Sequence, residues 1–219
     1  MTQQLHSLQP QVYQGQFGEY TITDSDRIGV MIYRTGLMIA ALCFAVGTGL
    51  VLWQSNNPLV LQALTPLYFC FWFALGVSLF TIHIYLAILH RVLQLFWLIG
   101  GIASVILAFQ SPEPLALTVY NQPLSLLGIG FSFAAITGIY FKEAFCFNRI
   151  ETKLLTPLVP LLLLGFMVGI WSVMNLKFLL FFWAIQFVIF AVRKTFQDIP
   201  ADIGDKSVFD YLHAQQAKA

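Results

Sequence analysis

Residues 35–53 read TGLMIAALCFAVGTGLVLW, a stretch without a single charged side chain. A helix that crosses the hydrocarbon core of a bilayer needs roughly 20 mostly apolar residues, so this stretch predicts a transmembrane helix. The whole chain has the same character, because 58% of its 219 residues are hydrophobic and only 10% are charged. A soluble domain carries about 25% charged residues, and a water-soluble fold is therefore close to excluded.

Five further apolar stretches extend this pattern along the chain. They are residues 66–89, 92–109, 124–141, 154–174 and the shorter 178–192. Only two residues separate the second helix from the third, so we expect a tight turn at 86–91 and an end of the second helix close to Tyr85. The sequence predicts an all-α polytopic membrane protein whose six transmembrane helices form a compact bundle over residues 35–192.

The Lys and Arg residues sort strongly to one side of the expected bundle. All but one of the eleven fall in the N-terminal segment, the loops after the second and fourth helices, and the C-terminal tail, while Lys177 falls on the other side. Because cytoplasmic loops carry the excess of bases, both termini are predicted to be cytoplasmic or stromal. Residues 1–34 then form a cytoplasmic segment, with a loose start at 1–16 and an interfacial helix at 25–34, and residues 193–219 form a cytoplasmic tail.

Three short motifs occur twice in the same order, 86–91 residues apart. Residues 44–49, 64–67 and 96–99 resemble residues 133–138, 155–158 and 182–185. Each set falls on three helices, so the second set would enter the membrane from the opposite side, as in the inverted 3+3 repeat of many transporters. Chance matching in a sequence rich in Leu and Phe explains the motifs equally well, and both interpretations stay open.

Charged side chains are missing from the middle of every expected helix. An ionisable group deep in a membrane is costly and usually marks function, so their absence weighs against a proton-coupled carrier and against catalysis within the bilayer. Cys43, Cys70 and Cys146 lack metal-binding spacing, and 11 basic against 10 acidic residues weighs against nucleic-acid binding. We therefore predict no catalytic residue and no metal site, and we expect the partners to be the lipid bilayer and other membrane proteins.

Two histidines are the candidate cofactor ligands. His83 and His90 lie seven residues apart, so they share a helical face if one helix continues between them. Either imidazole is a suitable axial ligand for a chlorophyll or a haem. Both residues also fall near the expected membrane boundary, and interfacial histidines that hydrogen bond to headgroups or loops are the commoner explanation.

The fourth loop, at residues 140–153, interleaves charges of both signs with aromatic side chains. One interpretation is a docking surface for another membrane protein, and the other is an ordinary loop with an aromatic belt and snorkelling bases. The candidate docking residues are Arg91 from the second turn and Lys142, Glu143, Phe145, Arg149 and Glu151 from this loop.

This loop also carries a resemblance to a known family. The runs FKEAFCF at 141–147 and LTPLVPLLLLG at 155–165, with Glu151 between them, resemble uncharacterised integral membrane proteins of cyanobacteria and plastids. Shorter matches are Ile22-Thr23, Asp26-Arg27 and His90-Arg91, so the resemblance covers roughly residues 16–194. It implies a photosynthetic host and a thylakoid or plasma membrane, and it carries over no catalytic residue.

These observations favour a non-enzymatic integral membrane accessory or assembly protein that supports a photosynthetic membrane complex. A transporter or channel for a small neutral solute is the alternative, and the repeated motifs favour it. A pigment-binding membrane protein, with His83 or His90 as the ligand of a chlorophyll, is the second alternative.

Overall fold

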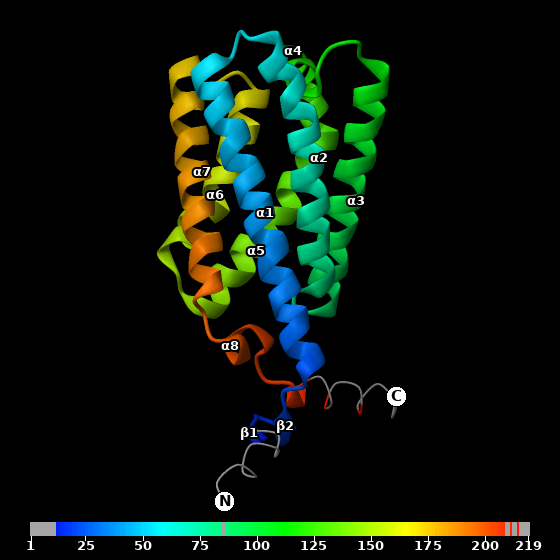
Figure 1. Cartoon of the computed structure of the whole chain (residues 1–219), viewed down its shortest axis with the longest axis vertical. Helices are drawn as coiled ribbons and strands as arrows, with labels where there is room; N and C mark the ends of the chain where they lie inside the picture. Colours follow the sequence, from blue (N-terminus) through cyan, green and yellow to red (C-terminus); the bar gives the residue numbers. More distant parts are fainter. Residues whose placement is uncertain (1–11, 85, 209–210, 212–213, 215–219) are drawn as a thin grey trace, which may run out of the picture.

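A computed structural model describes residues 12–84, 86–208, 211 and 214 of the chain. Six long helices stand side by side as a bundle, and a short hairpin and a short helix lie beyond one end of it (Figure 1). The long helices are α1 (Asp24–Gln54), α2 (Pro58–Thr81), α3 (Ala87–Gln110), α5 (Leu126–Phe147), α6 (Ile150–Met167) and α7 (Val173–Thr195). All six are long and apolar enough to cross a membrane, which confirms the predicted all-α fold with six transmembrane helices.

The shorter elements mark the two ends of the bundle. β1 (Val12–Gln14), β2 (Glu19–Thr21) and α8 (Ile199–Ile203) lie at the end where α1 begins, which we call the α8 end (Figure 1). α4 (Leu115–Asn121) lies at the opposite end, the α4 end, and a single 3-10 turn at Pro123–Ser125 follows it.

The long helices form a closed ring in chain order. Each packs against the next one along the chain, and α7 packs back against α1. In this ring the first three long helices and the last three occupy corresponding positions, as an inverted repeat requires. A ring of six consecutive helices does so with or without internal repetition, so the inverted repeat stays a prediction.

Helix boundaries depart from expectation where a cap or a proline sets them. α1 starts at Asp24, one residue before the expected start, from a capping box between Thr23 and Asp26. It then runs without a break through Arg34 into the first span. α2 starts at Pro58, earlier than expected, because the Asn57 side chain caps it and proline is well suited to a first turn.

The turn between α2 and α3 falls at residues 82–86 rather than at the predicted 86–91. The early start of α2 explains the shift, because its 24 residues at about 1.5 Å each already span about 36 Å. His90 and Arg91 therefore lie inside α3. Tyr85, the predicted end of the second helix, lies outside the described residues.

α2 and α3 are joined by a reciprocal pair of tryptophans. The Trp72 and Trp97 rings are stacked with centroids 4.4 Å apart, and each indole N–H donates to the backbone carbonyl of the other residue, at 2.9 and 2.8 Å. Gly76 and Gly101 lie one turn along from these tryptophans, and a Cβ at either glycine would clash with the ring from the other helix. Because lipid supplies no hydrophobic drive for helix association, close approach at small residues holds such neighbours together.

The hairpin of β1 and β2 is a feature that the local sequence does not reveal. Residues 1–16 are predicted to be loose, but β1 pairs antiparallel with β2; residues 1–11 lie outside the described residues. The backbone N–H of Gln16 donates to the Asp205 carboxylate at 2.6 Å, and this hydrogen bond lowers the pKa of that carboxyl. The partner is 189 residues away along the chain, so no local pattern indicates it.

Candidate functional site

A cavity of about 320 Å³ lies among the helices in the half of the bundle towards the α4 end. Helices α1, α2, α4, α5, α6 and α7 contribute to its wall, through residues that include Phe44, Leu64, Ala116, Leu126, Leu162 and Trp183. Almost all of this surface is apolar. The wall residues with a polar side-chain group are Cys43, Thr48, Tyr68, Tyr120 and Trp183, and the Trp183 indole N–H donates to the Tyr140 hydroxyl.

Aromatic side chains close the cavity towards the α8 end. The Phe44 ring of α1 and the Trp183 ring of the neighbouring helix α7 lie with centroids 4.3 Å apart. The Tyr68 hydroxyl is held by hydrogen bonds with Ser104 at 2.6 Å and with Ser132 at 2.9 Å, so its ring contributes a fixed part of the wall. Beyond this layer the axis is filled by fully buried side chains, among them Leu37, Leu75, Ile136, Tyr140 and Phe187.

The cavity also has two thinner boundaries. At the α4 end, the Tyr120 ring stacks on Phe166 of α6 with centroids 6.0 Å apart, and Tyr120 is more than half exposed. On the outside of the ring, α1 and α7 border a groove, and Thr48 lines both this groove and the cavity. The Thr48 side chain therefore stands between the cavity and the outer surface of the bundle.

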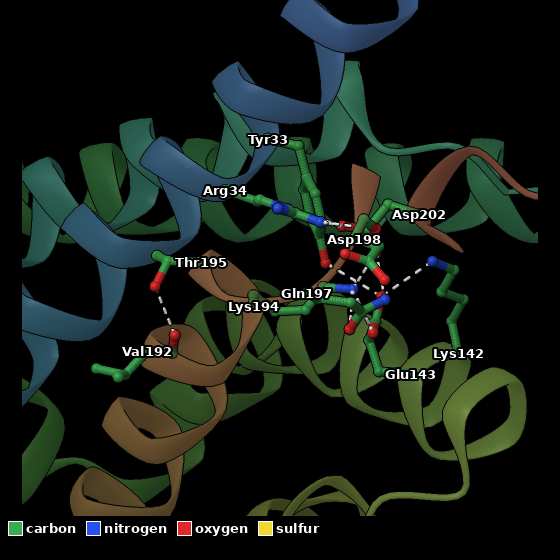
Figure 2. A network of polar contacts seen from close by, with 10 residues as sticks. All are labelled: Tyr33, Arg34, Lys142, Glu143, Val192, Lys194, Thr195, Gln197, Asp198 and Asp202. Atoms are coloured by element: carbon green, nitrogen blue, oxygen red, sulfur yellow. Dashed lines mark hydrogen bonds and ion pairs between the residues drawn. The ribbon is translucent and has the colours of Figure 1, made fainter. Parts of the chain in front are cut away.

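A cluster of buried charges lies at the α8 end (Figure 2). It consists of Arg34, Lys142, Glu143, Lys194 and Asp202, and we call it the ionic cluster. Asp202 of α8 pairs with the Arg34 guanidinium of α1 at 2.7 Å and with the Lys194 ammonium of α7. Glu143 of α5 pairs with Lys194 at 2.8 Å and with Lys142 at 2.9 Å. Lys194 thus lies between two carboxylates, and the cluster links α1, α5, α7 and α8.

Every member of the ionic cluster is less than 10% exposed. The Tyr33 hydroxyl donates to Glu143 at 3.2 Å, and the Gln197 amide donates to Asp202 at 3.2 Å. Among the described residues, the one buried side-chain nitrogen or oxygen without a partner belongs to Ser125, outside the cluster. Buried charges are tolerated only when they are paired and hydrogen-bonded. The ion pairs of Asp202 with Arg34 and Lys194 therefore hold α8 against the end of the ring.

The structure divides the predicted docking residues into two groups. Three are buried in ion pairs within the chain: Lys142, Glu143 and Glu151. Lys142 and Glu143 face inward because α5 continues through this region to Phe147, and Glu151 pairs with Arg193 of α7 from the first turn of α6. The other three are exposed: Arg91, Phe145 and Arg149. A docking role for the six residues stays a prediction.

Sequence reasoning missed Arg34, Lys194 and Asp202 as parts of one site. Arg34 and Lys194 lie near the expected ends of spans, where basic side chains usually reach headgroups. Asp202 lies in a polar tail whose helix is only five residues long. The one available signal is Pro200, because a proline often occupies the first turn of a helix.

The two candidate ligand histidines do not share a helical face, because the turn at 82–86 separates them. His83 lies in this turn, partly buried near Gly29 of α1, and burial lowers the pKa of its imidazole. Nε2 of His90 makes a hydrogen bond with the Leu79 carbonyl, so this nitrogen is already engaged. Neither histidine lines the cavity. Within the described part of the chain, no group of three or more His, Cys, Asp or Glu could hold a metal ion.

Comparison with known families identifies the chain at the family level. The model of a family described as uncharacterized integral membrane protein (DUF2301) matches residues 77–211, more than half of the chain. The matched region extends from the end of α2 beyond α8, and the chain belongs to this family. No curated protein and no solved structure matches the chain significantly.

Neutralising Asp202 is expected to loosen the α8 end. In Asp202→Asn, Arg34 and Lys194 lose a shared carboxylate while they stay buried, and removing one partner of a buried ion pair costs about 3–5 kcal/mol. We expect the midpoint of thermal unfolding in detergent, followed by circular dichroism, to fall by roughly 6–20 °C.

Asp198→Asn is the matched control for this experiment. It makes the same chemical change in the same segment, at an exposed carboxylate that forms no ion pair among the described residues. We expect its midpoint to stay within about 2 °C of the unmodified protein. Equal midpoints for the two variants would contradict the central role of Asp202.

Proposed function

We propose that this member of the DUF2301 family is a non-enzymatic accessory protein that holds an apolar molecule inside its helix ring. The observation that carries the proposal is the cavity of about 320 Å³ with an almost wholly apolar wall. Cavities of about 300–1,000 Å³ are the usual size for small-molecule sites. A charged or strongly polar occupant would lose its hydrogen bonds to water without replacement, so the wall favours a hydrocarbon chain.

The route of entry that we propose is lateral. The groove between α1 and α7 faces away from the ring, and Thr48 separates it from the cavity. Gly47 and Gly49 flank Thr48 on α1, so this stretch of the wall carries little side-chain bulk. An acyl or prenyl chain in the bilayer, or the apolar part of a pigment, would pass from the groove past Thr48 without crossing water.

The proposed role includes support of a larger membrane complex, and the family resemblance suggests a photosynthetic complex in a thylakoid or plasma membrane. The exposed residues Arg91, Phe145 and Arg149 supply a surface for such a partner at the α8 end. Pigment ligation by His83 or His90 would have to occur outside the cavity, since neither residue lines it.

A carrier for a neutral solute is the second candidate. The observation that favours it is a cavity on the axis of a helix ring whose one end is closed by the ionic cluster. Opening that end would require Lys194 to leave both of its carboxylates. Because the wall of the cavity is apolar, the solutes that such a carrier would accept are apolar or weakly polar.

Filling the cavity tests the proposal directly. In Gly47→Phe the new ring would enter the cavity, because a Cβ at Gly47 makes only an ordinary contact of 3.6 Å with Leu64. Gly130→Phe is the matched control, since a Cβ there meets nothing closer than 4.0 Å and Gly130 lies outside the cavity wall.

The measurement is mass spectrometry of apolar compounds extracted by organic solvent from protein purified out of its native membrane. We expect the unmodified chain and Gly130→Phe to retain the same compound at similar occupancy, and Gly47→Phe to retain about tenfold less. Equal retention by all three proteins would remove the proposal.

Association with a larger complex is expected in native membranes. Solubilised in mild detergent and separated by native electrophoresis, the protein should migrate with a species much larger than the single chain. Recovery only as an unassociated small species would count against the accessory role and leave the cavity experiment to decide on binding.

We propose that both termini lie on the cytoplasmic or stromal side, as the distribution of bases predicts. In a chain with its three cysteines replaced by serine, Lys153→Cys reports on the α8 end and Asn121→Cys on the α4 end. A membrane-impermeant maleimide added to right-side-out vesicles should label Asn121→Cys and reach Lys153→Cys only after permeabilisation. The reverse pattern would invert the topology.

A further inference from the structure

A second cavity, of about 230 Å³, lies between the start of α6 and the end of α7 at the α8 end. Its wall differs from that of the apolar cavity because charged side chains form much of it. The charged residues are Glu143, Arg149, Glu151, Arg193 and Lys194. Three bases therefore meet two carboxylates, and the cavity carries an excess of one positive charge.

Both carboxylates of this cavity are already paired with bases other than Arg149. Glu151, buried at the start of α6, accepts from Nη1 of Arg193 at 3.0 Å. Glu143 is occupied by Lys194 and Lys142 of the ionic cluster. No acid of the cavity is left to neutralise Arg149.

The guanidinium groups of Arg149 and Arg193 still have N–H donors for a ligand. Among the described residues, the exposed Arg149 side chain forms no ion pair. Arg193 uses Nη1 for Glu151, and its side chain is 45% exposed. The buried Thr152 hydroxyl donates to the Arg149 carbonyl at 3.1 Å, which holds the backbone of Arg149 at the rim. A guanidinium presents N–H donors in a fork that matches the oxygens of a phosphate.

Apolar side chains beside the cavity place it at the level of a membrane interface. Phe145, Ile150 and Phe196 are each more than 70% exposed and surround the ends of α5, α6 and α7. Aromatic residues and bases occur together where a span meets the headgroups. Basic pockets between helices at this level are suited to anionic lipid headgroups.

We propose that Arg149 and Arg193 bind the phosphate group of an anionic phospholipid at the α8 end. The phosphate lies between the two guanidinium groups and offsets the excess positive charge of the cavity and of the neighbouring ionic cluster. The acyl chains lie outside the bundle against Phe145, Ile150 and Phe196. This site is separate from the apolar cavity, so the two proposals stand or fall independently.

Titration with phosphatidylglycerol tests the proposal on the full chain in detergent, with native mass spectrometry as the readout. Phosphatidylcholine with the same acyl chains and inorganic phosphate are the comparison ligands. We expect phosphatidylglycerol to bind about tenfold more tightly than phosphatidylcholine, and inorganic phosphate at equal concentration to leave it bound.

Arg149→Gln is the decisive variant because it breaks no ion pair within the described chain. It should weaken phosphatidylglycerol about tenfold and leave phosphatidylcholine unchanged. Arg193→Lys keeps a charge for Glu151 but loses the fork, and it should weaken phosphatidylglycerol at least threefold. Lys153→Gln is the matched control, since it removes an exposed base one turn after Arg149.

Equal losses in Arg149→Gln and Lys153→Gln would overturn the proposal, because general surface charge would then explain the binding. Displacement of phosphatidylglycerol by an equal concentration of inorganic phosphate would also overturn it, since the ligand would then be the free anion. Unchanged thermal unfolding of Arg149→Gln and Lys153→Gln confirms that both variants keep the fold.

Discussion

The Lys194 ammonium, held between the carboxylates of Glu143 and Asp202, is the interaction on which the α8 end of this molecule depends. The charges lie where little water can reach them, so each must find its opposite within the protein. Glu143 belongs to α5 and Asp202 to α8, and Asp202 also holds Arg34 of α1. One ammonium and its partners thus fix the ends of three spanning helices and the short helix that crosses them.

The sizes of the side chains decide which part of the ring is filled and which part is left as a cavity. Small residues lie where neighbouring helices meet, as Gly76 and Gly101 do beneath the paired tryptophans, and large aromatic rings then project towards the axis. Aromatic rings and aliphatic side chains together fill the axis from the ionic cluster up to Phe44 and Trp183. Towards α4 the α1 wall changes to Gly47 and Thr48, and space remains. The apolar cavity therefore exists because the side chains at Gly47 and Thr48 are too small to fill the space beside them.

The six spans could be predicted because each depends on the composition of about 20 consecutive residues. Boundaries were less predictable where a single residue decides them, as Asn57 does for the start of α2. The candidate site was largely hidden, because Lys142 and Glu143 look like an interfacial loop until their partners are known. Lys142 and Glu143 pair with each other, but Glu143 also pairs with Lys194 and accepts from Tyr33, and both of these residues are far away along the chain. Pairing over such a distance leaves no periodic signal in the sequence.

The place of Asp202 in the chain has a consequence for biogenesis. Arg34 enters the membrane with the first helix, and its carboxylate partner is synthesised 168 residues later. Chains are made and begin to fold from the N-terminus, so Arg34 lacks its ion pair with Asp202, and Glu143 its ion pair with Lys194, until residues 194–202 have been synthesised. The nascent bundle remains able to rearrange its helices during that interval. Once α8 has been synthesised, Asp202 pairs with Arg34 and Lys194, and this pairing fixes the arrangement of the helices.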